Sequence, residues 1–263
     1  MRLDKFVVMA GAGKRKDARG LIEAGRILVN GDICSVCAVE IDENNDIIQW
    51  DSKVLKPAKR VYYMLNKPAG YMTALKDSES KVVFELFNPV HRKGLFHVGR
   101  LDKDTEGMLL FTNDGEFEHS VMDPLKHVVK KYFFIALGVL DEDKKKRLTD
   151  GVSIGKDEPI ARAGNVEIEM NTNSNDEDSM VKYDIRRYYQ GFSDKYTQSV
   201  TIGSISISEG RKHQVKRMLK AVGCQVIYLR RVSIGGLTLD ENLNTGEYRE
   251  LKPWEVNKAL EKE

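Results

Sequence analysis

The chain has 263 residues, enough for one large domain or for a large and a small one, each with a buried core. Lys and Arg number 42 against 40 Asp and Glu, so the net charge of +2 gives little support for a polyanionic partner by itself. The apolar run at residues 6–10 is too short for a signal peptide, no stretch is long enough for a membrane span, and three cysteines make no disulfide framework, so we expect a cytoplasmic protein.

Apolar residues at helical spacing predict two short helices near the N-terminus, over residues 3–10 and 18–22. Gly25 follows as a helix stop, and residues 26–29 have the composition of a strand. Asn30 and Gly31 are typical of a tight hairpin turn between two strands. The sequence thus begins with a small α/β unit.

Basic residues gather on the second predicted helix. Arg15 and Arg19 lie four residues apart, away from the apolar side, and Lys14 and Lys16 flank Arg15. The chain holds seven basic and three acidic residues up to position 26, and only acidic ones from 27 to 51. The pattern fits a solvated helix face or, alternatively, a docking face for phosphates.

The run RLDKFVVMAGAGKRKDARGLIEAGRILVNGD, residues 2–32, resembles the small RNA-binding domain named after ribosomal small-subunit protein four, the S-four or S4 domain. The resemblance extends over roughly the first 45 residues. It implies that the basic face binds RNA through Lys14, Arg15, Lys16 and Arg19. One departure is the start of the second helix, where Gly13 and Lys14 stand in place of a Ser or Thr cap.

Residues 52–60 contain Pro57 and four basic residues, a composition typical of a linker. We therefore expect an RNA-binding domain with its linker at 1–58 and a larger domain at 59–263. In the larger part, strands are predicted at 62–65, 108–112, 132–137 and 204–207, and a helix at 211–222. Strands and helices do not alternate strictly, which favours an α+β fold over a doubly wound sheet. The Asn- and Asp-rich residues 171–178 predict an exposed loop.

Three features of the sequence do not support a metal or nucleotide site. Residues 11–14 resemble a phosphate-binding loop but lack the upstream Gly and the following Ser or Thr. Cys34 and Cys37 form one C-x-x-C with no second pair, so buried small apolar side chains are favoured over metal ligands. The five histidines contain no pair at metal-binding helical spacing. We expect no metal ion.

Three later segments resemble the pseudouridine synthase superfamily: HVGRLDKDTEGMLLFTNDG at 97–115, KKYFF at 130–134 and SEGRKHQVKRM at 208–218. Within it, the branch that acts on small-subunit ribosomal RNA is resembled most, through AVG at 221–223, IGGLTLD at 234–240 and GEYREL at 246–251. The resemblance spans nearly the whole chain. It implies the pseudouridine synthase fold, a mixed and largely antiparallel central sheet with flanking helices, and a cofactor-free isomerase that makes pseudouridine.

Matching the motifs residue by residue implies a catalytic set. Asp102 matches the nucleophile, a carboxylate that attacks the sugar or the ring. Tyr132 matches the tyrosine that lies against the target base and helps to remove the ring proton, and Leu229 matches the apolar residue across the pocket. Without the resemblance, Asp102 would be assigned to a turn, and Tyr132 and Leu229 to the core.

A carboxylate beside a flat base tends to take up a proton unless a fixed cation favours its ionised form. The resemblance favours Lys216 as that cation, although many members have Arg there and Arg217 is an alternative. Lys212, Lys216 and Lys220 repeat every fourth position on the predicted helix. A solvated lysine stripe accounts for Lys212 and Lys220.

The bond to be broken is inaccessible in stacked RNA, so the nucleotide must be flipped out, at a cost of about a few kcal/mol. Arg100, next to Asp102, matches a residue that fills the vacated space, with a surface salt bridge as the alternative. The resemblance adds Arg211, Gln214 and Arg217 to the substrate-binding set.

The expected partner is small-subunit ribosomal RNA or an assembling small-subunit particle, bound by a monomer without a small-molecule cofactor. Two alternatives remain open: an enzyme of the superfamily that acts on large-subunit RNA, and a non-catalytic RNA-binding assembly factor. The second would be marked by loss of the nucleophile, and Asp102 is present.

Overall fold

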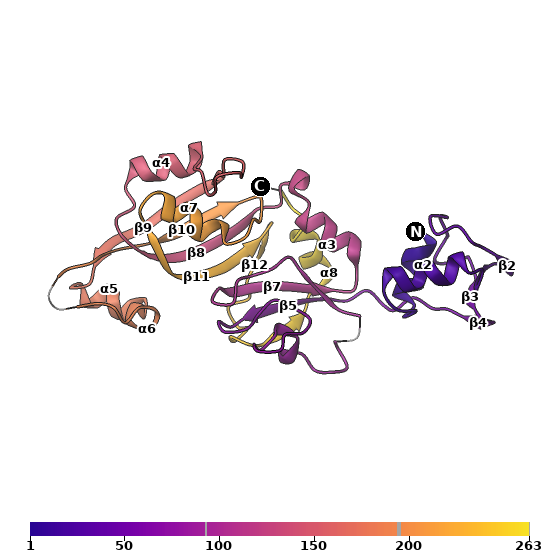
Figure 1. Ribbon diagram of the computed structural model, residues 1–263. Helices are drawn as coiled ribbons and strands as arrows, with labels where there is room; N and C mark the ends of the chain where they lie inside the picture. The colour runs from indigo at the N-terminus through magenta and orange to yellow at the C-terminus, as the bar shows by residue number, and fades with distance from the viewer. Residues whose placement is uncertain (93, 194–195, 263) are drawn as a thin grey trace. The chain divides into compact units, whose positions relative to one another are not determined.

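The structure, a computed structural model, describes residues 1–92, 94–193 and 196–262. The chain divides into two compact units, Met1–Val61 and Tyr62–Glu263. Both units combine helices with antiparallel strands (Figure 1). No helix in the described ranges is long and apolar enough to cross a membrane.

The smaller unit packs two helices on a sheet that has four strands in the described residues. The helices are α1 (Leu3–Met9) and α2 (Arg15–Glu23), and the strands in sheet order are β2 (Asp32–Ile33), β1 (Ile27–Val29), β3 (Ile48–Trp50) and β4 (Lys53–Val54). The apolar residues that predicted the helices, including Leu3, Phe6 and Ile22, are buried against Ile27 and Ile48 of the sheet. Burial of this shared apolar face holds the unit together.

Two local features of the smaller unit follow from short-range chemistry. The predicted hairpin is confirmed, because Asn30 and Gly31 have φ values of 53° and 93° and join the antiparallel strands β1 and β2. The second helix begins at Arg15 without a Ser or Thr cap. Instead the Asp17 carboxylate accepts a hydrogen bond of 2.8 Å from the Lys14 backbone N–H, which satisfies one donor at the helix start.

The larger unit is built on one mixed sheet, with nine strands in the described residues. In the order β13-β5-β7-β11-β8-β10-β9 the strands are Tyr248–Glu250, Tyr62–Lys67, Glu106–Thr112, Gln225–Ile234, Lys130–Leu137, Ser199–Ile207 and Asn165–Asn173; β6 (Phe96–Val98) pairs with β7 and β12 (Leu237–Thr238) with β11. Strands β7 and β11 pair in parallel, and the other strand pairs of this sheet in the described residues are antiparallel. This confirms the predicted mixed, largely antiparallel sheet of an α+β fold.

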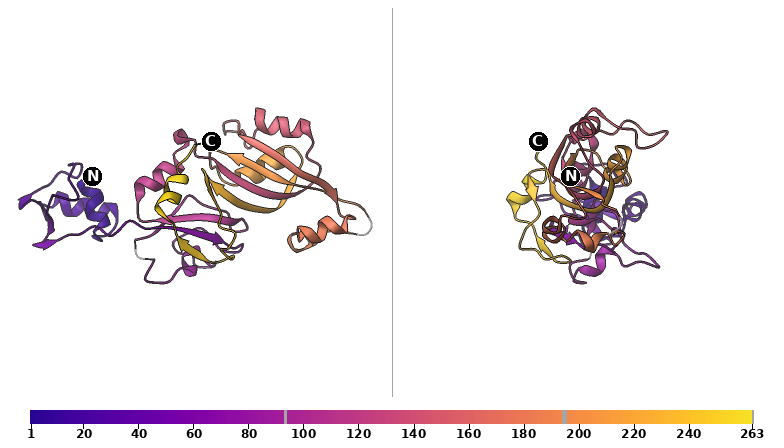
Figure 2. Two further views of the ribbon diagram at one scale, coloured as in Figure 1. Left: turned by 180° about the vertical axis from the view of Figure 1, so that it is seen from behind. Right: turned by 90° about the vertical axis from the view of Figure 1, so that its left-hand side faces the viewer.

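Helices flank this sheet at several places (Figures 1 and 2). They are α3 (Gly115–Met122), α4 (Glu142–Asp150), α5 (Glu177–Lys182), α6 (Ile185–Tyr188), α7 (Gln214–Ala221) and α8 (Pro253–Lys258), with short 3-10 turns at Val83–Leu86 and Pro124–Lys126. The main core lies under α3 and α8, where Phe117, Val121 and Ala259 cover Met108 and Ile234 of the sheet. Helix α7 packs on β11, the central strand of the sheet order.

The predicted loop at 171–178 is wrong. Strand β9 continues through Asn173, and α5 begins at Glu177, so the turn is confined to residues 174–176. Pairing with β10 satisfies the backbone, and the Asn171 side chain is fixed by hydrogen bonds to Leu140 and Thr201. Tertiary pairing here outweighs the low strand propensity of Asn.

The predicted helix at 211–222 begins later than expected. Helix α7 begins at Gln214, after His213, which has a left-handed φ of 53°. Lys212 therefore precedes the helix, and the lysine repeat inferred from it is wrong at that position. Lys216 and Lys220 remain four residues apart on α7.

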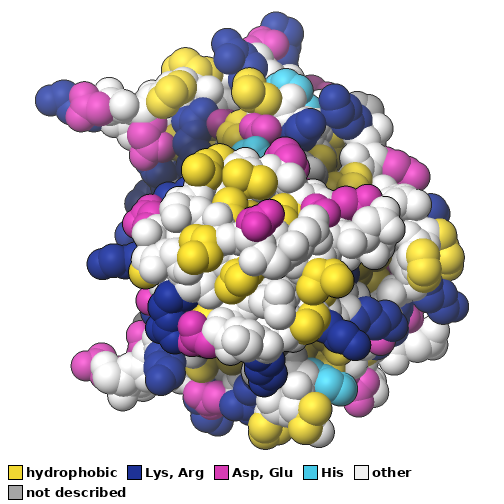
Figure 3. Space-filling model, turned by 90° about the vertical axis from the view of Figure 1, so that its right-hand side faces the viewer, with side chains coloured by type: hydrophobic (Ala, Val, Ile, Leu, Met, Phe, Trp, Pro, Cys, Tyr) yellow, Lys and Arg dark blue, Asp and Glu magenta, His cyan; other side chains and the backbone are white. Residues whose placement is uncertain are grey.

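The cysteines are free thiols of two kinds. Cys224 is buried, whereas Cys34 and Cys37 are partly exposed at the edge of the small core, so the prediction of burial is wrong for those two. No group of three or more His, Cys, Asp or Glu in the described ranges could hold a metal ion. On the face drawn in Figure 3, basic and acidic side chains are interspersed, consistent with the net charge of +2.

Candidate active site

The segment that carries Asp102 is a loop held between two paired strands. Strands β6 and β7 are antiparallel neighbours, so residues 99–105 must leave one strand and return to the next. The Thr73 hydroxyl donates to the Leu101 carbonyl at 2.8 Å and accepts from the Leu101 N–H at 3.2 Å. The loop is therefore fixed at its first half by a side chain from outside it.

A buried lysine fixes the second half of the loop. Lys67 is fully buried at the end of β5, and its Nζ donates to the carbonyls of Asp102, Lys103 and Thr105 at 3.0, 3.3 and 2.8 Å, and to that of Pro68 at 3.0 Å. Burial lowers the pKa of Lys67 to about 8, although nearby acids oppose the shift. Sequence reasoning missed Lys67; a lysine ending an apolar strand was the available signal.

The Asp102 carboxylate faces two cationic or potentially cationic side chains. Lys216 Nζ lies 3.5 Å from Oδ2 of Asp102, and His213 Nε2 lies 3.5 Å from Oδ1. Lys216 also lies 2.5 Å from Oδ1 of Asp104. Burial alone would raise the pKa of Asp104, but the hydrogen bond and charge of Lys216 outweigh it and lower the pKa. His213 and Asp104 were not among the predicted residues.

Two adjoining cavities open at this carboxylate. The larger, of about 840 Å³, is lined by Asp102, Arg100 and Tyr132, and the smaller, of about 60 Å³, adds Leu229. Tyr132 and Leu229 are buried, with 8% and 4% of their surface exposed. The structure thus brings together an acid, an aromatic ring and an aliphatic side chain from β8, β11 and the 99–105 loop.

Arg100 is exposed at the mouth of both cavities. Among the described residues, no hydrogen bond or ion pair engages its guanidinium. The surface salt bridge considered as an alternative is therefore not formed with them, and the side chain is available to a ligand.

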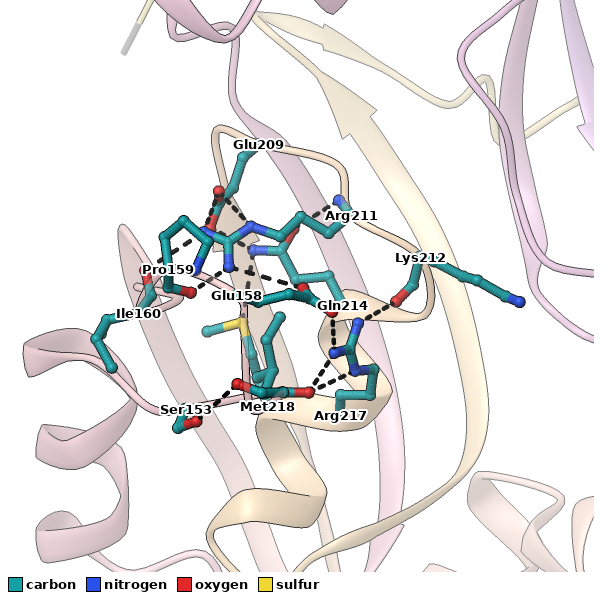
Figure 4. A network of polar contacts seen from close by, with 12 residues as sticks. Ser153, Glu158, Pro159, Ile160, Glu209, Arg211, Lys212, Gln214, Arg217 and Met218 are labelled. Atoms are coloured by element: carbon teal, nitrogen blue, oxygen red, sulfur yellow. Dashed lines mark hydrogen bonds and ion pairs between the residues drawn. The ribbon is translucent and has the colours of Figure 1, made fainter.

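Arg211, Gln214 and Arg217 belong to a network of polar contacts beside the site (Figure 4). Arg211 and Gln214 both donate to the Glu209 carboxylate, at 2.7 Å each. Arg217 donates to the Ile154 carbonyl at 2.8 Å and to the Glu158 carboxylate. Arg211 and Gln214 line the smaller cavity, whereas Arg217 is committed to Glu158, so Lys216 is the α7 cation that lies beside Asp102.

Three arginines of the smaller unit, Arg2, Arg15 and Arg19, converge on one buried acid. Asp4 is fully buried, and its Oδ2 lies 3.2 Å from Arg19 Nε and 3.6 Å from Arg15 Nε. Burial would raise the pKa of Asp4, but hydrogen bonds from Arg2 and Arg19 lower it. Lys14 and Lys16 are exposed. Asp4 therefore neutralises part of the arginine charge and leaves the two lysines free of that constraint.

Comparison with known proteins agrees with this arrangement. The family model of RNA pseudouridylate synthases matches residues 61–221, and that of the S4 domain matches residues 1–44. An uncharacterized RNA pseudouridine synthase, YtzG of Bacillus subtilis (strain 168), is 34% identical over 260 residues, which are 98% of this chain and 97% of the relative.

Two further matches extend over nearly the whole chain. The ribosomal small subunit pseudouridine synthase A of Escherichia coli (strain K12) is 32% identical over 257 residues, 97% of this chain and 98% of its own. A crystal structure of a pseudouridylate synthase, 30% identical, covers 98% of this chain and 99% of its own with a TM-score of 0.62. The chain belongs to the family of RNA pseudouridylate synthases, which are isomerases, and carries an S4 domain at its N-terminus.

Proposed function

We propose that the protein converts one uridine of small-subunit ribosomal RNA into pseudouridine, with Asp102 as the nucleophile. The observation that carries this proposal is the position of the Asp102 carboxylate, 3.5 Å from Lys216 Nζ and on the wall of a cavity that Tyr132 also lines. A carboxylate beside a fixed cation is suited to attack on the ribose or the ring.

The reaction rearranges one nucleoside without a net gain or loss of atoms. The bond from C1′ to N1 breaks, the base turns, and a bond forms from C1′ to C5. N1 gains a proton, and C5 loses one. Asp102 either adds to the ring or attacks C1′, and both routes need its ionised form. Tyr132 lies against the base and assists removal of the C5 proton.

Binding requires that the uridine leave the RNA stack. Arg100, exposed and without a partner among the described residues, takes the space that the base vacates. Leu229 packs on the base from the side opposite Tyr132, while Arg211 and Gln214 shape the smaller cavity and Arg217 supports α7 through Glu158. The S4 domain grips the RNA backbone through Lys14, Arg15, Lys16 and Arg19.

Small-subunit RNA is proposed as the substrate because relatives that match over nearly their whole length are named ribosomal small subunit pseudouridine synthase A. The enzyme is proposed to work as a monomer, either on free RNA or on an assembling particle.

The proposal is tested by mapping pseudouridine in small-subunit RNA and in partly assembled particles after incubation with wild type, with Asp102→Asn and with Asp157→Asn. Asp157 is an exposed aspartate that lines neither cavity, so its variant is the matched control. Alkali-resistant carbodiimide adducts, read by primer extension, should give one new stop with wild type and Asp157→Asn and none with Asp102→Asn.

The same assay on large-subunit RNA separates the alternatives. A stop there and none in small-subunit RNA would move the substrate to the large subunit. RNA that is bound but unmodified in both would make the protein a non-catalytic assembly factor.

A further inference from the structure

Two cationic side chains, Lys130 of β8 and Arg231 of β11, are buried near Tyr132. Lys130 and Arg231 are 4% and 3% exposed. Lys130 Nζ donates to the Val121 carbonyl at 3.0 Å, and Arg231 Nε donates to the Met108 carbonyl at 2.7 Å. The Nη2 of Arg231 is buried and has no hydrogen-bond partner among the described residues. The fold therefore holds charged donors that it does not fully use.

The sheet brings these side chains to the active-site cavity. Lys130 and Tyr132 are alternate residues of β8 and so lie on the same face of the sheet. Arg231 of β11 is the direct cross-strand partner of Tyr132, and its Nη1 lies 3.5 Å from the tyrosine hydroxyl. Lys130, Tyr132 and Arg231 all line the cavity of about 840 Å³ that holds Asp102.

No carboxylate in the described ranges forms an ion pair with Lys130 or Arg231. Of the acids on the cavity wall, Asp102 faces Lys216 and His213, and Glu209 is bound by Arg211 and Gln214. The third, Glu118, forms no ion pair with either cation. Burial, together with the like charge of Arg231, lowers the pKa of Lys130 to about 8.

Burying a cation without a counter-charge costs free energy, because the charged group loses its hydration and gains no acidic partner. A ligand that brings negative charge would remove this cost. Uracil carbonyls can accept hydrogen bonds but carry no net charge. The phosphates of RNA accept hydrogen bonds and also carry negative charge. Arginine binds phosphate through two parallel donors.

We infer that Lys130 and Arg231 bind a backbone phosphate of the RNA next to the extruded uridine, and so hold the nucleotide with its base against Tyr132. This assignment rests on the proposed function and adds a phosphate subsite to it. Since Arg231 contacts Tyr132 directly, the phosphate and the tyrosine are positioned by the same side chain.

The test combines a protein change with a charge removed from the RNA. A synthetic segment that contains the mapped uridine is ligated into small-subunit RNA, with either a phosphodiester or an uncharged methylphosphonate at one flanking linkage. Both RNAs of each pair carry a 2′-deoxy sugar on the 5′ side of that linkage, which prevents cleavage. For the linkage on the 3′ side of the target this is the uridine's own sugar, so the methylphosphonate RNA is always compared with the phosphodiester RNA that has the same deoxy sugar. Wild type, Arg231→Gln and Arg230→Gln are compared by KM and kcat.

For wild type, the methylphosphonate at one of the two flanking linkages should raise KM about tenfold to hundredfold, the range of a lost hydrogen bond to a charged group. Arg231→Gln should raise KM similarly on normal RNA and show no further loss on the methylphosphonate RNA. Arg230 precedes Arg231 on β11 and points to the other face, so Arg230→Gln should respond like wild type.

The inference is overturned if neither methylphosphonate raises the KM of wild type. It is also overturned if the methylphosphonate raises the KM of Arg231→Gln by the same factor as it raises the KM of wild type. Should Arg231→Gln not fold by circular dichroism, Lys130→Met takes its place in the same cycle and must show the same loss of response. If wild type modifies normal RNA but responds to neither methylphosphonate, only the phosphate subsite fails. If wild type modifies no ribosomal RNA, the proposed function itself fails.

Discussion

Lys216 lies closer to Asp104 than to Asp102: its Nζ is 2.5 Å from Oδ1 of Asp104 and 3.5 Å from Oδ2 of Asp102. The lysine is therefore shared between two carboxylates of one loop. Asp104 holds the ammonium group in place, while the longer separation leaves the Asp102 carboxylate less tightly bound. An acid bound in this way keeps a stabilising cation nearby and can still move toward a substrate atom.

Replacing Lys216 should separate catalysis from binding. Lys216→Gln removes the cation that faces Asp102, so we expect kcat to fall about 100-fold to 1,000-fold, the range for loss of one electrostatic group. The RNA dissociation constant should change by only a few-fold. Lys220→Gln, an exposed lysine one turn further on α7, is the control. Equal losses in both variants would argue against a special role for Lys216.

Lys67 should matter for stability and for the loop together. Lys67→Met leaves four carbonyl groups without their shared donor, so the free energy of unfolding should fall by about 2–4 kcal/mol. Because three of these carbonyls belong to the 99–105 loop, kcat should fall as well. Urea melts and single-turnover rates measure the two effects, with the exposed Lys76→Met as the control. Unchanged stability would mean that the loop does not depend on this lysine.

The buried Lys130 should make stability depend on pH in the alkaline range. Its pKa is lowered from 10.5 to about 8 in the folded protein, so between these values the unfolded chain binds more protons. The contribution of Lys130 to stability is therefore complete above about pH 10.5 and is lost as pH falls through about 8, a difference of at most about 3 kcal/mol.

Urea melts of wild type and Lys130→Met at pH values from 7 to 10 check this dependence. The stability of wild type relative to the variant should rise with pH across that interval. A difference between the two proteins that stays constant with pH would show that Lys130 titrates normally.

The basic face of the smaller unit is best tested through its lysines. Reversing Arg15 and Arg19 should weaken RNA binding, but it would also place acids beside the buried Asp4 and so disturb the fold. Lys14→Gln with Lys16→Gln avoids this problem, since both side chains are exposed. The slope of log affinity against log salt should become shallower by about one to two. An unchanged slope would mean that RNA phosphates do not contact these lysines.

Local patterns succeeded where the structure depends on neighbouring residues. Asn30 and Gly31 predicted the hairpin because few residues adopt positive φ at low cost, and the apolar periodicity of α1 and α2 predicted their buried faces. They failed where distant partners decide. The Asn-rich end of β9 is a strand because β10 pairs with it, and α7 begins only at Gln214, after His213 with its left-handed φ of 53°.

By itself, the sequence determined the family, the α+β class and the identity of the proposed nucleophile. Sequence motifs and the spacing of apolar residues suffice for these because they involve residues near one another in the chain. Only the tertiary structure decided that Lys216 rather than Arg217 lies beside Asp102, that Lys67 holds the loop, and that Arg231 meets Tyr132 across two strands. The physical reason is that charge pairing and burial depend on distances between residues far apart in the chain, and those distances are set by the packing of the whole sheet.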